Sequence, residues 1–496
     1  MTRPPNVVIV VLDCVRANEF PDGTSPIEGL DFLNTLKGSC LRFTRAVSPS
    51  SWSIPSHATL LTGRQPWEHH AHGKGNLRLD PSVPRLSTQL KSQGYNSALL
   101  SANPLIGHEY GLGLGFDYTE SASPFDSYLR FRRKARSKIR AMPRPDGEVS
   151  GATEFFRAAS LVACHGLSRV PWSFDVTAQM GRFLRNEPRS PLPPPVSPWI
   201  EPTLSDWVSA QPRGSPLFAF VNLIDAHEPY LAMPGGGSSL RDWWNLARTR
   251  QDLFGWATGR WSPTASERSN LKQLYANSLR RLDLRLKRIV RILQETDRWD
   301  DTLFIVTSDH GQALGERDLL FHGLRVDESV IRIPLWVKSP HGASVGEVSD
   351  RWVSLADVTA EVLKTAGVEA SHFTSGTPLT APVLAPQGPA CSVSDGVVFW
   401  DIANGVPEAR RKELDHVIGA AYHESLKATV DVTDGRHRLF DIVADPEERR
   451  NIFDPSIPTH AHLAERARTV ATSVRDSSRT ERDFSIDERL SAWGYL

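Results

Sequence analysis

Cysteine is scarce and scattered in this sequence. The 496 residues include four cysteines, at positions 14, 40, 164 and 391, with no CxxC pair among them. A disulfide framework or a zinc knuckle requires cysteines at short, paired spacings. The pattern therefore excludes both as the basis of the fold.

Long apolar runs and an excess of either charge are also missing. The N-terminal apolar run VVIVVL covers only residues 7–12 and is followed by Asp13 and Arg16, which is too short for a signal peptide or a membrane span. Lys plus Arg and Asp plus Glu both number 57, so net charge favours no polyanionic partner. We therefore expect a cytoplasmic protein with no integral membrane segment and no nucleic-acid partner; no pattern indicates its oligomeric state.

Strands and helices alternate along most of the chain. Apolar runs typical of strands buried on both faces occupy residues 6–13, 216–225, 301–311 and 331–340, and amphipathic helical patterns occupy residues 83–95, 271–293 and 354–368. Strands that are apolar on both faces are typical of parallel sheets covered by helices. The sequence thus predicts an α/β fold with a mostly parallel sheet sandwiched by helices.

The pattern changes in two regions. Residues 119–215 are irregular, with a basic run at 130–140 and a Pro-rich run at 188–199. We expect this region to be an insertion that shapes the substrate pocket of a catalytic domain covering residues 1–385. Short strands separated by turn residues follow, so residues 386–496 are predicted to form a smaller antiparallel α+β subdomain.

Three of the predicted strands end at an aspartate, namely Asp13, Asp225 and Asp309. Open α/β sheets bind ligands at the carboxyl ends of their strands. A lone aspartate there is more often a turn or cap residue, but Asp309 is followed directly by His310. Carboxylates suit a divalent cation, and an imidazole shifts the preference towards Mn, Zn or Fe. Asp13, Asp309 and His310 are therefore candidate metal ligands.

The stretch SSWSIPSHATLLTGR, residues 50–64, predicts a loop running into a helix, with Pro55 in the first turn and Gly63 at the far end. Serine is a common N-cap, which is the simpler interpretation. The alternative is that the Ser53 hydroxyl, activated by the metal as a further ligand, attacks an anionic ester held at the helix N-terminus.

Histidines and a lysine elsewhere are further candidates. His227 in DAHEPY is placed to protonate a leaving group, although a loop histidine is more often a surface residue. His322 follows His310 by 12 residues and provides a second donor. The motif HHAHGKG adds Lys74, while its histidines fit a solvated loop better than a metal-binding tract.

Several stretches, in this order, resemble one family. They are NVVIVVLDCVRAN, SWSIPSHATLLTGR, RLDPSVPRLSTQLKSQGYNSALLSANP, FVNLIDAHEPY, TLFIVTSDHGQALGE, HGLRVDESVIRIPLWVKSP, HRLFDIVADPEERRNIFD and RLSAWGYL. The chain is similar to the sulfatase branch of the alkaline phosphatase superfamily, and most to bacterial members with an S/T-x-P-S-H signature. The resemblance implies a large, mostly parallel mixed sheet between helices, with a small C-terminal antiparallel sheet.

The same resemblance implies roles for individual residues. The metal ligands would be Asp13, Ser53, Asp309 and His310. The catalytic residues would be Ser53, His57, His227 and His322, and the substrate-binding residues would be Asn103 and Lys74. Ser53 occupies the position of the catalytic formylglycine, and His322 stands where many relatives have lysine.

The sequence departs from the family pattern in ways that bear on chemistry. Ser53 replaces the usual cysteine, and His57 stands where the serine-type maturation motif has arginine, so formylglycine is not expected. Cys14 replaces the second aspartate after the first strand, and His310 replaces the asparagine common in calcium-dependent sulfatases. We expect one divalent metal ion (Mn, Zn, Mg or Ca), with His310 shifting the preference away from calcium.

A metal-dependent hydrolase follows from these residues. The expected substrate is a small anionic ester, either a sulfate ester or a related phosphate or phosphonate ester, attacked by Ser53. Two alternatives remain at this point. One is a transferase that moves a phosphoryl-type group to an acceptor alcohol, and the other is an inactive binding homologue, which would purify without divalent metal.

Overall fold

The computed structural model describes residues 4–121, 199–228, 230, 249, 256, 259, 261–342, 346–369, 372–381, 390–396, 412 and 414–477. Most of the predicted insertion, including its basic and Pro-rich runs, lies outside the described residues, as do the predicted boundary at residue 385 and the closing RLSAWGYL stretch.

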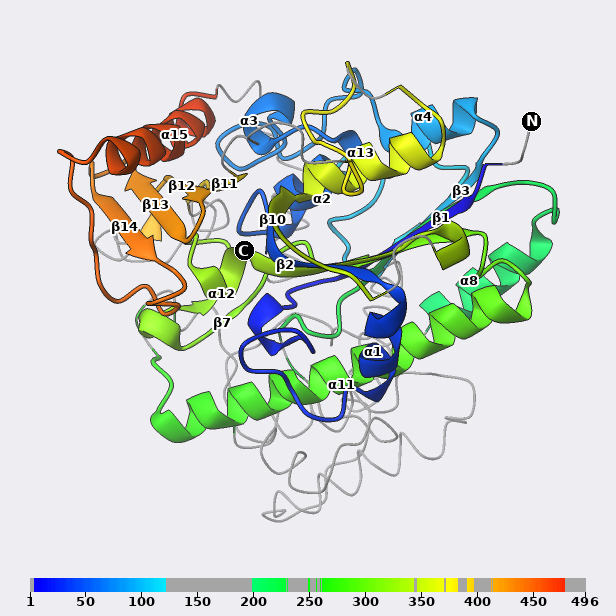
Figure 1. Cartoon of the computed structure of the whole chain (residues 1–496), viewed down its shortest axis with the longest axis horizontal. Helices are drawn as coiled ribbons and strands as arrows, with labels where there is room; N and C mark the ends of the chain where they lie inside the picture. Colours follow the sequence, from blue (N-terminus) through cyan, green and yellow to red (C-terminus); the bar gives the residue numbers. More distant parts are fainter. Residues whose placement is uncertain are drawn as a thin grey trace, which may run out of the picture.

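A mixed eight-stranded sheet forms the centre of the molecule (Figure 1). Its strands, in spatial order, are β10 (Val348–Ser354), β2 (Leu41–Val47), β9 (Arg332–Lys338), β6 (Thr302–Thr307), β1 (Asn6–Leu12), β5 (Leu217–Leu223), β3 (Asn96–Ser101) and β4 (Tyr118–Ser121). Only β9 pairs antiparallel to its neighbours, β2 and β6. The other described pairs are parallel.

Helices cover both faces of this sheet (Figure 1). One face carries α2 (Ser53–Thr62), α4 (Leu86–Ser92) and α13 (Leu355–Thr365), with the short α3 (Pro66–His69) beside them; the other carries α1 (Asp31–Leu36), α8 (Ile200–Ala210) and the long α11 (Ala265–Glu295). Alternate residues of β1 divide between the two cores: Val7 and Ile9 pack on the α2 side, and Val8 and Val10 on the α11 side. This alternation explains why the strand sequence is apolar throughout.

The predicted elements are confirmed, with one correction. The apolar runs at 6–13, 216–225 and 301–311 are β1, β5 and β6, and the three amphipathic patterns are α4, α11 and α13. The run at 331–340 is β9, a strand as expected, but it is antiparallel rather than parallel. Burial on both faces produces the same apolar run in either direction, so composition does not reveal strand orientation.

A second, antiparallel sheet follows in the C-terminal part of the chain. Its strands are β11 (Ala390–Ser394), β12 (Ile418–His423), β13 (Leu426–Asp431) and β14 (His437–Asp441), and α15 (Pro458–Arg475) packs against them. Lys427 of β13 is fully buried and pairs with Glu328 of α12 (Glu328–Ile331) at 3.0 Å and with Glu448 at 2.7 Å. The pair with Glu328 ties the small sheet to the segment that follows the two-stranded sheet of β7 (Ala313–Leu314) and β8 (Leu320–Phe321).

Within the described part of the chain, no helix combines the length and apolar character that a membrane crossing needs.

Candidate active site

The ends of two neighbouring strands bring the predicted ligands together. β1 and β6 are parallel and in register, with Val11 opposite Thr307, so the residues that follow them emerge at the same edge. Asp13 and Asp309 are both fully buried there. The Cys14 backbone N–H donates to Asp309 Oδ1 at 3.3 Å, which links the two strand ends.

Helix α2 delivers Ser53 to the same place. Ser53 is the first residue of the helix, and Gly63 ends it in the left-handed conformation, with φ 68°. The entry loop is braced by hydroxyls: Ser48 Oγ donates to the carbonyl oxygens of Ser50 and Asp309 and lies 3.0 Å from Ser56 Oγ. The hydroxyls of Ser48 and Ser56 therefore hold the loop, while the Ser53 hydroxyl faces the strand ends.

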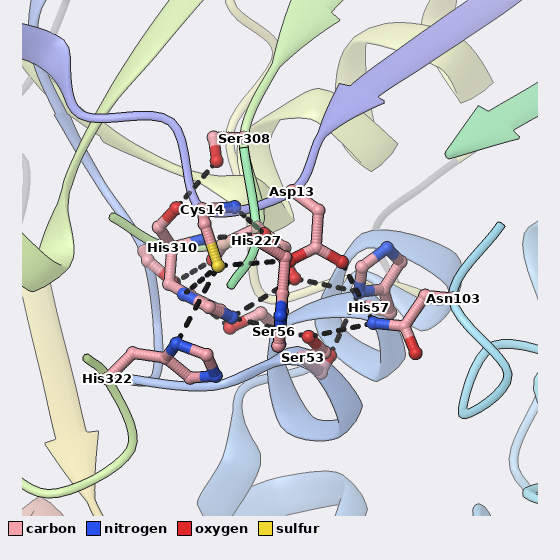
Figure 2. Close-up of polar contacts among 12 residues, drawn as sticks. Asp13, Cys14, Ser53, Ser56, His57, Asn103, His227, Ser308, His310 and His322 are labelled. Atoms are coloured by element: carbon pink, nitrogen blue, oxygen red, sulfur yellow. Dashed lines mark hydrogen bonds and ion pairs between the residues drawn. The ribbon is translucent and has the colours of Figure 1, made fainter. Parts of the chain in front are cut away.

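The Ser53 hydroxyl lies at the centre of a small polar cluster (Figure 2). Its Oγ is 3.3 Å from His310 Nε2 and 3.2 Å from Asn103 Nδ2. Asn103, which follows β3, also donates to Asp13 Oδ2 at 2.8 Å. The side chains of Ser53, Asp13, Asn103 and His310 thus lie together at the strand ends.

The tautomer of His310 follows from its backbone contact. Its Nδ1 lies 2.9 Å from the Gly311 carbonyl oxygen, which only accepts, so Nδ1 carries the proton. Nε2 therefore presents a lone pair, 3.3 Å from Ser53 Oγ and 3.3 Å from Asp309 Oδ2. Histidines that bind metals typically donate their other ring N–H to a carbonyl in this way.

The carboxylates of this cluster fit a divalent cation. Asp309 Oδ2 is buried and accepts no hydrogen bond from the described residues. Within the same described part of the chain, no lysine or arginine forms an ion pair with Asp13 or Asp309. Buried carboxylates are costly without a compensating positive charge. Two carboxylates, an imidazole nitrogen and a hydroxyl are suitable ligands for a divalent metal ion. Such an ion would supply the compensating positive charge.

His57 supports the start of α2. Its Nδ1 donates to the Ser53 carbonyl oxygen at 2.9 Å and lies 3.5 Å from Asp309 Oδ2. Burial lowers the pKa of His57 to about 4, so its ring is neutral near pH 7. The structure thus places His57 beside the nucleophile candidate and a candidate ligand.

His227 and His322 form the far side of the cluster. Their ring centroids are 4.9 Å apart, and those of His322 and His310 are 4.4 Å apart. Burial tends to lower the pKa of His227, but the negative charges of Glu228 and Asp13 outweigh it and raise this pKa. Burial and the neighbouring histidines lower the pKa of His322 well below its ordinary value. The pKa values of these two adjacent histidines are therefore shifted in opposite directions.

Asp225 and Lys74 have ion-pair partners of their own. The carboxylate of Asp225 pairs with Arg285 of α11, at 2.7 Å. Asp225 therefore differs from the other two strand-end aspartates, because α11 supplies a buried cation beside the end of β5. Lys74 forms an ion pair with Asp415 at 2.8 Å.

Sequence reasoning missed Glu228 and Gln312. Both lie in motifs that it quoted, directly after His227 and two residues after His310. Gln312 Nε2 donates to Glu228 Oε2 at 2.6 Å, and Gln312 Oε1 lies 2.7 Å from His322 Nδ1. Only the fold reveals this bridge, because Gln312 and Glu228 are 84 positions apart.

Together the mixed sheet and the small C-terminal sheet define a fold of the alkaline phosphatase-like class. The phosphonate monoester hydrolase of Agrobacterium radiobacter has the same fold: the two structures superpose with a TM-score of 0.64 at 20% identity, over 95% of each chain.

The Sulfatase family model matches residues 5–146 and 185–368, and the chain belongs to the sulfatase family. Choline-sulfatase of Rhizobium meliloti (strain 1021) is 22% identical over 484 residues, covering 91% of this chain and 83% of the relative. The multifunctional alkaline phosphatase superfamily protein PehA of Trinickia caryophylli is 24% identical over 437 residues, covering 79% of each. These relationships make the protein a sulfuric or phosphoric ester hydrolase.

Proposed function

We propose that the protein hydrolyses small sulfate, phosphate or phosphonate monoesters with unmodified Ser53 as the nucleophile. The observation that carries this proposal is the position of Ser53 Oγ, 3.3 Å from His310 Nε2 and 3.2 Å from Asn103 Nδ2 at the first turn of α2. Relatives named for choline sulfate and for phosphonate monoesters support both substrate types.

Asp13, Asp309, His310 and Ser53 would hold one divalent metal ion. When bound, such an ion lowers the pKa of a coordinated hydroxyl and stabilises negative charge on ester oxygens. The free backbone N–H groups at the start of α2 are also suited to the substrate's oxyanions.

Ser53, His227 and Asn103 have separate roles in the reaction. The Ser53 hydroxyl releases its proton to solvent water, and its Oγ forms a bond to sulfur or phosphorus as the bond to the leaving alcohol breaks. His227, with its raised pKa, donates a proton to the departing oxygen. Asn103 orients Ser53 and Asp13 through its two hydrogen bonds. Water then breaks the Ser53 ester and restores the hydroxyl.

Intact-mass measurement and peptide mapping test the chemical state of Ser53. A formylglycine would lack two hydrogen atoms relative to serine, and we expect the unmodified mass. Rapid quenching during turnover of 4-nitrophenyl sulfate, 4-nitrophenyl phosphate and 4-nitrophenyl phenylphosphonate should then trap a sulfo or phospho adduct on the Ser53 peptide.

The Ser53→Ala variant tests the nucleophile. We expect it to lose turnover and the adduct, while Ser51→Ala keeps both. Ser51 is a matched control because its hydroxyl is equally buried and has no hydrogen bond to the described residues. Full activity of Ser53→Ala would rule out the proposed nucleophile.

A further inference from the structure

Gln312 bridges His322 and Glu228 on the far side of the candidate active site. Its side chain is fully buried. Its Nε2 donates to Glu228 Oε2 at 2.6 Å and to the Tyr230 hydroxyl at 2.9 Å. Its Oε1 lies 2.7 Å from His322 Nδ1. Gln312 therefore contacts His322 through one end of its amide and Glu228 through the other.

Glu228 determines which way the amide of Gln312 points. An ionised carboxylate oxygen only accepts hydrogen bonds, so the NH₂ group of Gln312 must face it. The amide oxygen is then left facing His322. A carbonyl oxygen also only accepts, so the proton of a neutral His322 must lie on Nδ1. The orientation of one amide thus fixes the position of one proton.

We infer that Gln312 is a positioning residue that holds the His322 proton on Nδ1 and leaves Nε2 as a proton acceptor facing the substrate. In Figure 2 the Nε2 atom lies on the side of the ring towards Ser53, while Nδ1 lies towards Cys14. The rings of His227 and His310 pack against that of His322. A lysine at this position, as the family resemblance implies for many relatives, would only donate hydrogen bonds through its ammonium group.

This tautomer gives His322 a defined task, which rests on the proposed function. A serine ester has no internal route to release its anion, so water must break it. The water oxygen forms a bond to sulfur or phosphorus, and the water proton moves to His322 Nε2. The bond from that atom to Ser53 Oγ breaks, Oγ leaves with the electron pair, and the proton then returns to Oγ. His322 ends neutral, and the products are the free anion and serine.

A second metal ion is the competing explanation for this cluster. Ligand-type atoms of Cys14, His227, Glu228 and His322 all lie within 4.8 Å of one another. However, His322 Nδ1 and Glu228 Oε2 already share hydrogen bonds with Gln312, and the Cys14 thiol donates to Asp13 Oδ1 at 3.2 Å. The hydrogen-bonded arrangement therefore accounts for these atoms without a second ion.

Nitrogen NMR of the full-length protein labelled with ¹⁵N-histidine tests the inference directly. The two neutral tautomers have distinct ¹⁵N shifts, and the His322→Gln variant identifies the His322 signals. We expect protonated Nδ1 in the unsubstituted protein and in Tyr230→Phe, because Glu228 still fixes the amide. In Gln312→Met and Glu228→Gln we expect a mixture of tautomers. A proton on Nε2 in the unsubstituted protein, an unchanged tautomer in Gln312→Met, or loss of the Nδ1 proton on adding Zn²⁺ would overturn the inference.

Kinetics separate this inference from the proposed function. With 4-nitrophenyl phosphate, Gln312→Met should lower kcat by about 10²-fold, the lower range for loss of a general base, with KM lowered as well. The Ser53 adduct should accumulate in quenched samples because only its hydrolysis is slowed. Absence of any Ser53 adduct in all variants would contradict the proposed function, while the NMR signals would still decide the role of Gln312. An equal loss of adduct formation and hydrolysis would overturn the role given to His322.

Discussion

Removing the guanidinium of Arg285 should destabilise the protein far more than removing that of Arg288, although both lie on α11 and pair with Glu201. Arg285 binds Glu201 through two hydrogen bonds, of 3.0 and 2.6 Å, and binds Asp225 through one of 2.7 Å. Only 7% of its side chain is exposed. Arg288 reaches Glu201 at 3.7 Å, and 66% of its side chain is exposed.

The magnitude follows from what each substitution leaves behind. Arg285→Met would leave two carboxylates buried without their main cation, and breaking a buried pair in this way costs about 3–5 kcal/mol. Arg281 lies 3.8 Å from Asp225 and keeps a partial counter-charge there, so we expect the lower end of that range. Arg288→Met removes a solvent-screened pair and should cost below about 1 kcal/mol.

Urea unfolding followed by circular dichroism and tryptophan fluorescence measures both changes. The two probes together show whether the transition is cooperative enough to compare free energies. Asp225 begins the loop that carries His227, so Arg285→Met should also lower kcat at temperatures where it stays folded. Equal midpoints for the two variants would refute the reasoning that burial, rather than the number of ion pairs, decides the cost.

Three further outcomes are expected. Asp309→Asn should lose divalent metal, measured by plasma mass spectrometry on the purified protein, and an unchanged metal content would contradict its role as a ligand. Burial, with the charge of a neighbouring histidine, lowers the pKa of His69 from 6.5 to about 3. As pH falls, the unfolded chain therefore takes up a proton at this histidine before the folded protein does. The free energy of unfolding should decline between pH 6.5 and pH 3 by up to about 1.4 kcal/mol per pH unit. His69→Asn should flatten that decline in urea titrations at successive pH values, whereas an unaltered slope would assign it to other groups. Lys427→Met leaves the carboxylates of Glu328 and Glu448 without their shared cation and should lower the melting temperature, measured by calorimetry. An unchanged melting temperature would show that the two ion pairs of Lys427 contribute little to stability.

The sequence predicted the sheet and the edge that carries the candidate site for the same physical reason. Strands buried on both faces are apolar at every position, so the polar residue that ends each run is conspicuous. Asp13 and Asp309 could therefore be paired before the fold was known, because parallel strands place their carboxyl ends at one edge. The helix start at Ser53 was equally visible from Pro55 and Gly63.

A polar residue at the end of an apolar strand did not reveal its role where its ion-pair partner lies on a distant helix. Asp225 ends its strand as Asp13 does, and nothing local distinguishes them. Its partner Arg285 lies 60 positions away in a helix whose pattern predicts only packing. The bridge through Gln312 was invisible for the same reason, since an isolated glutamine has no periodicity or spacing that indicates a contact.

Glu228 provides a single origin for the contrast between the two histidines. Its charge acts directly on His227, whose Nδ1 lies 3.6 Å from Oε2, and favours the protonated ring. It acts on His322 through Gln312, by fixing the amide that accepts the Nδ1 proton. Glu228→Gln should therefore impair both the departure of the alcohol and the hydrolysis of the Ser53 ester, whereas Gln312→Met should impair only the second. A donor for the first step and an acceptor for the second are then set by one carboxylate, which is the arrangement that a plain serine nucleophile requires.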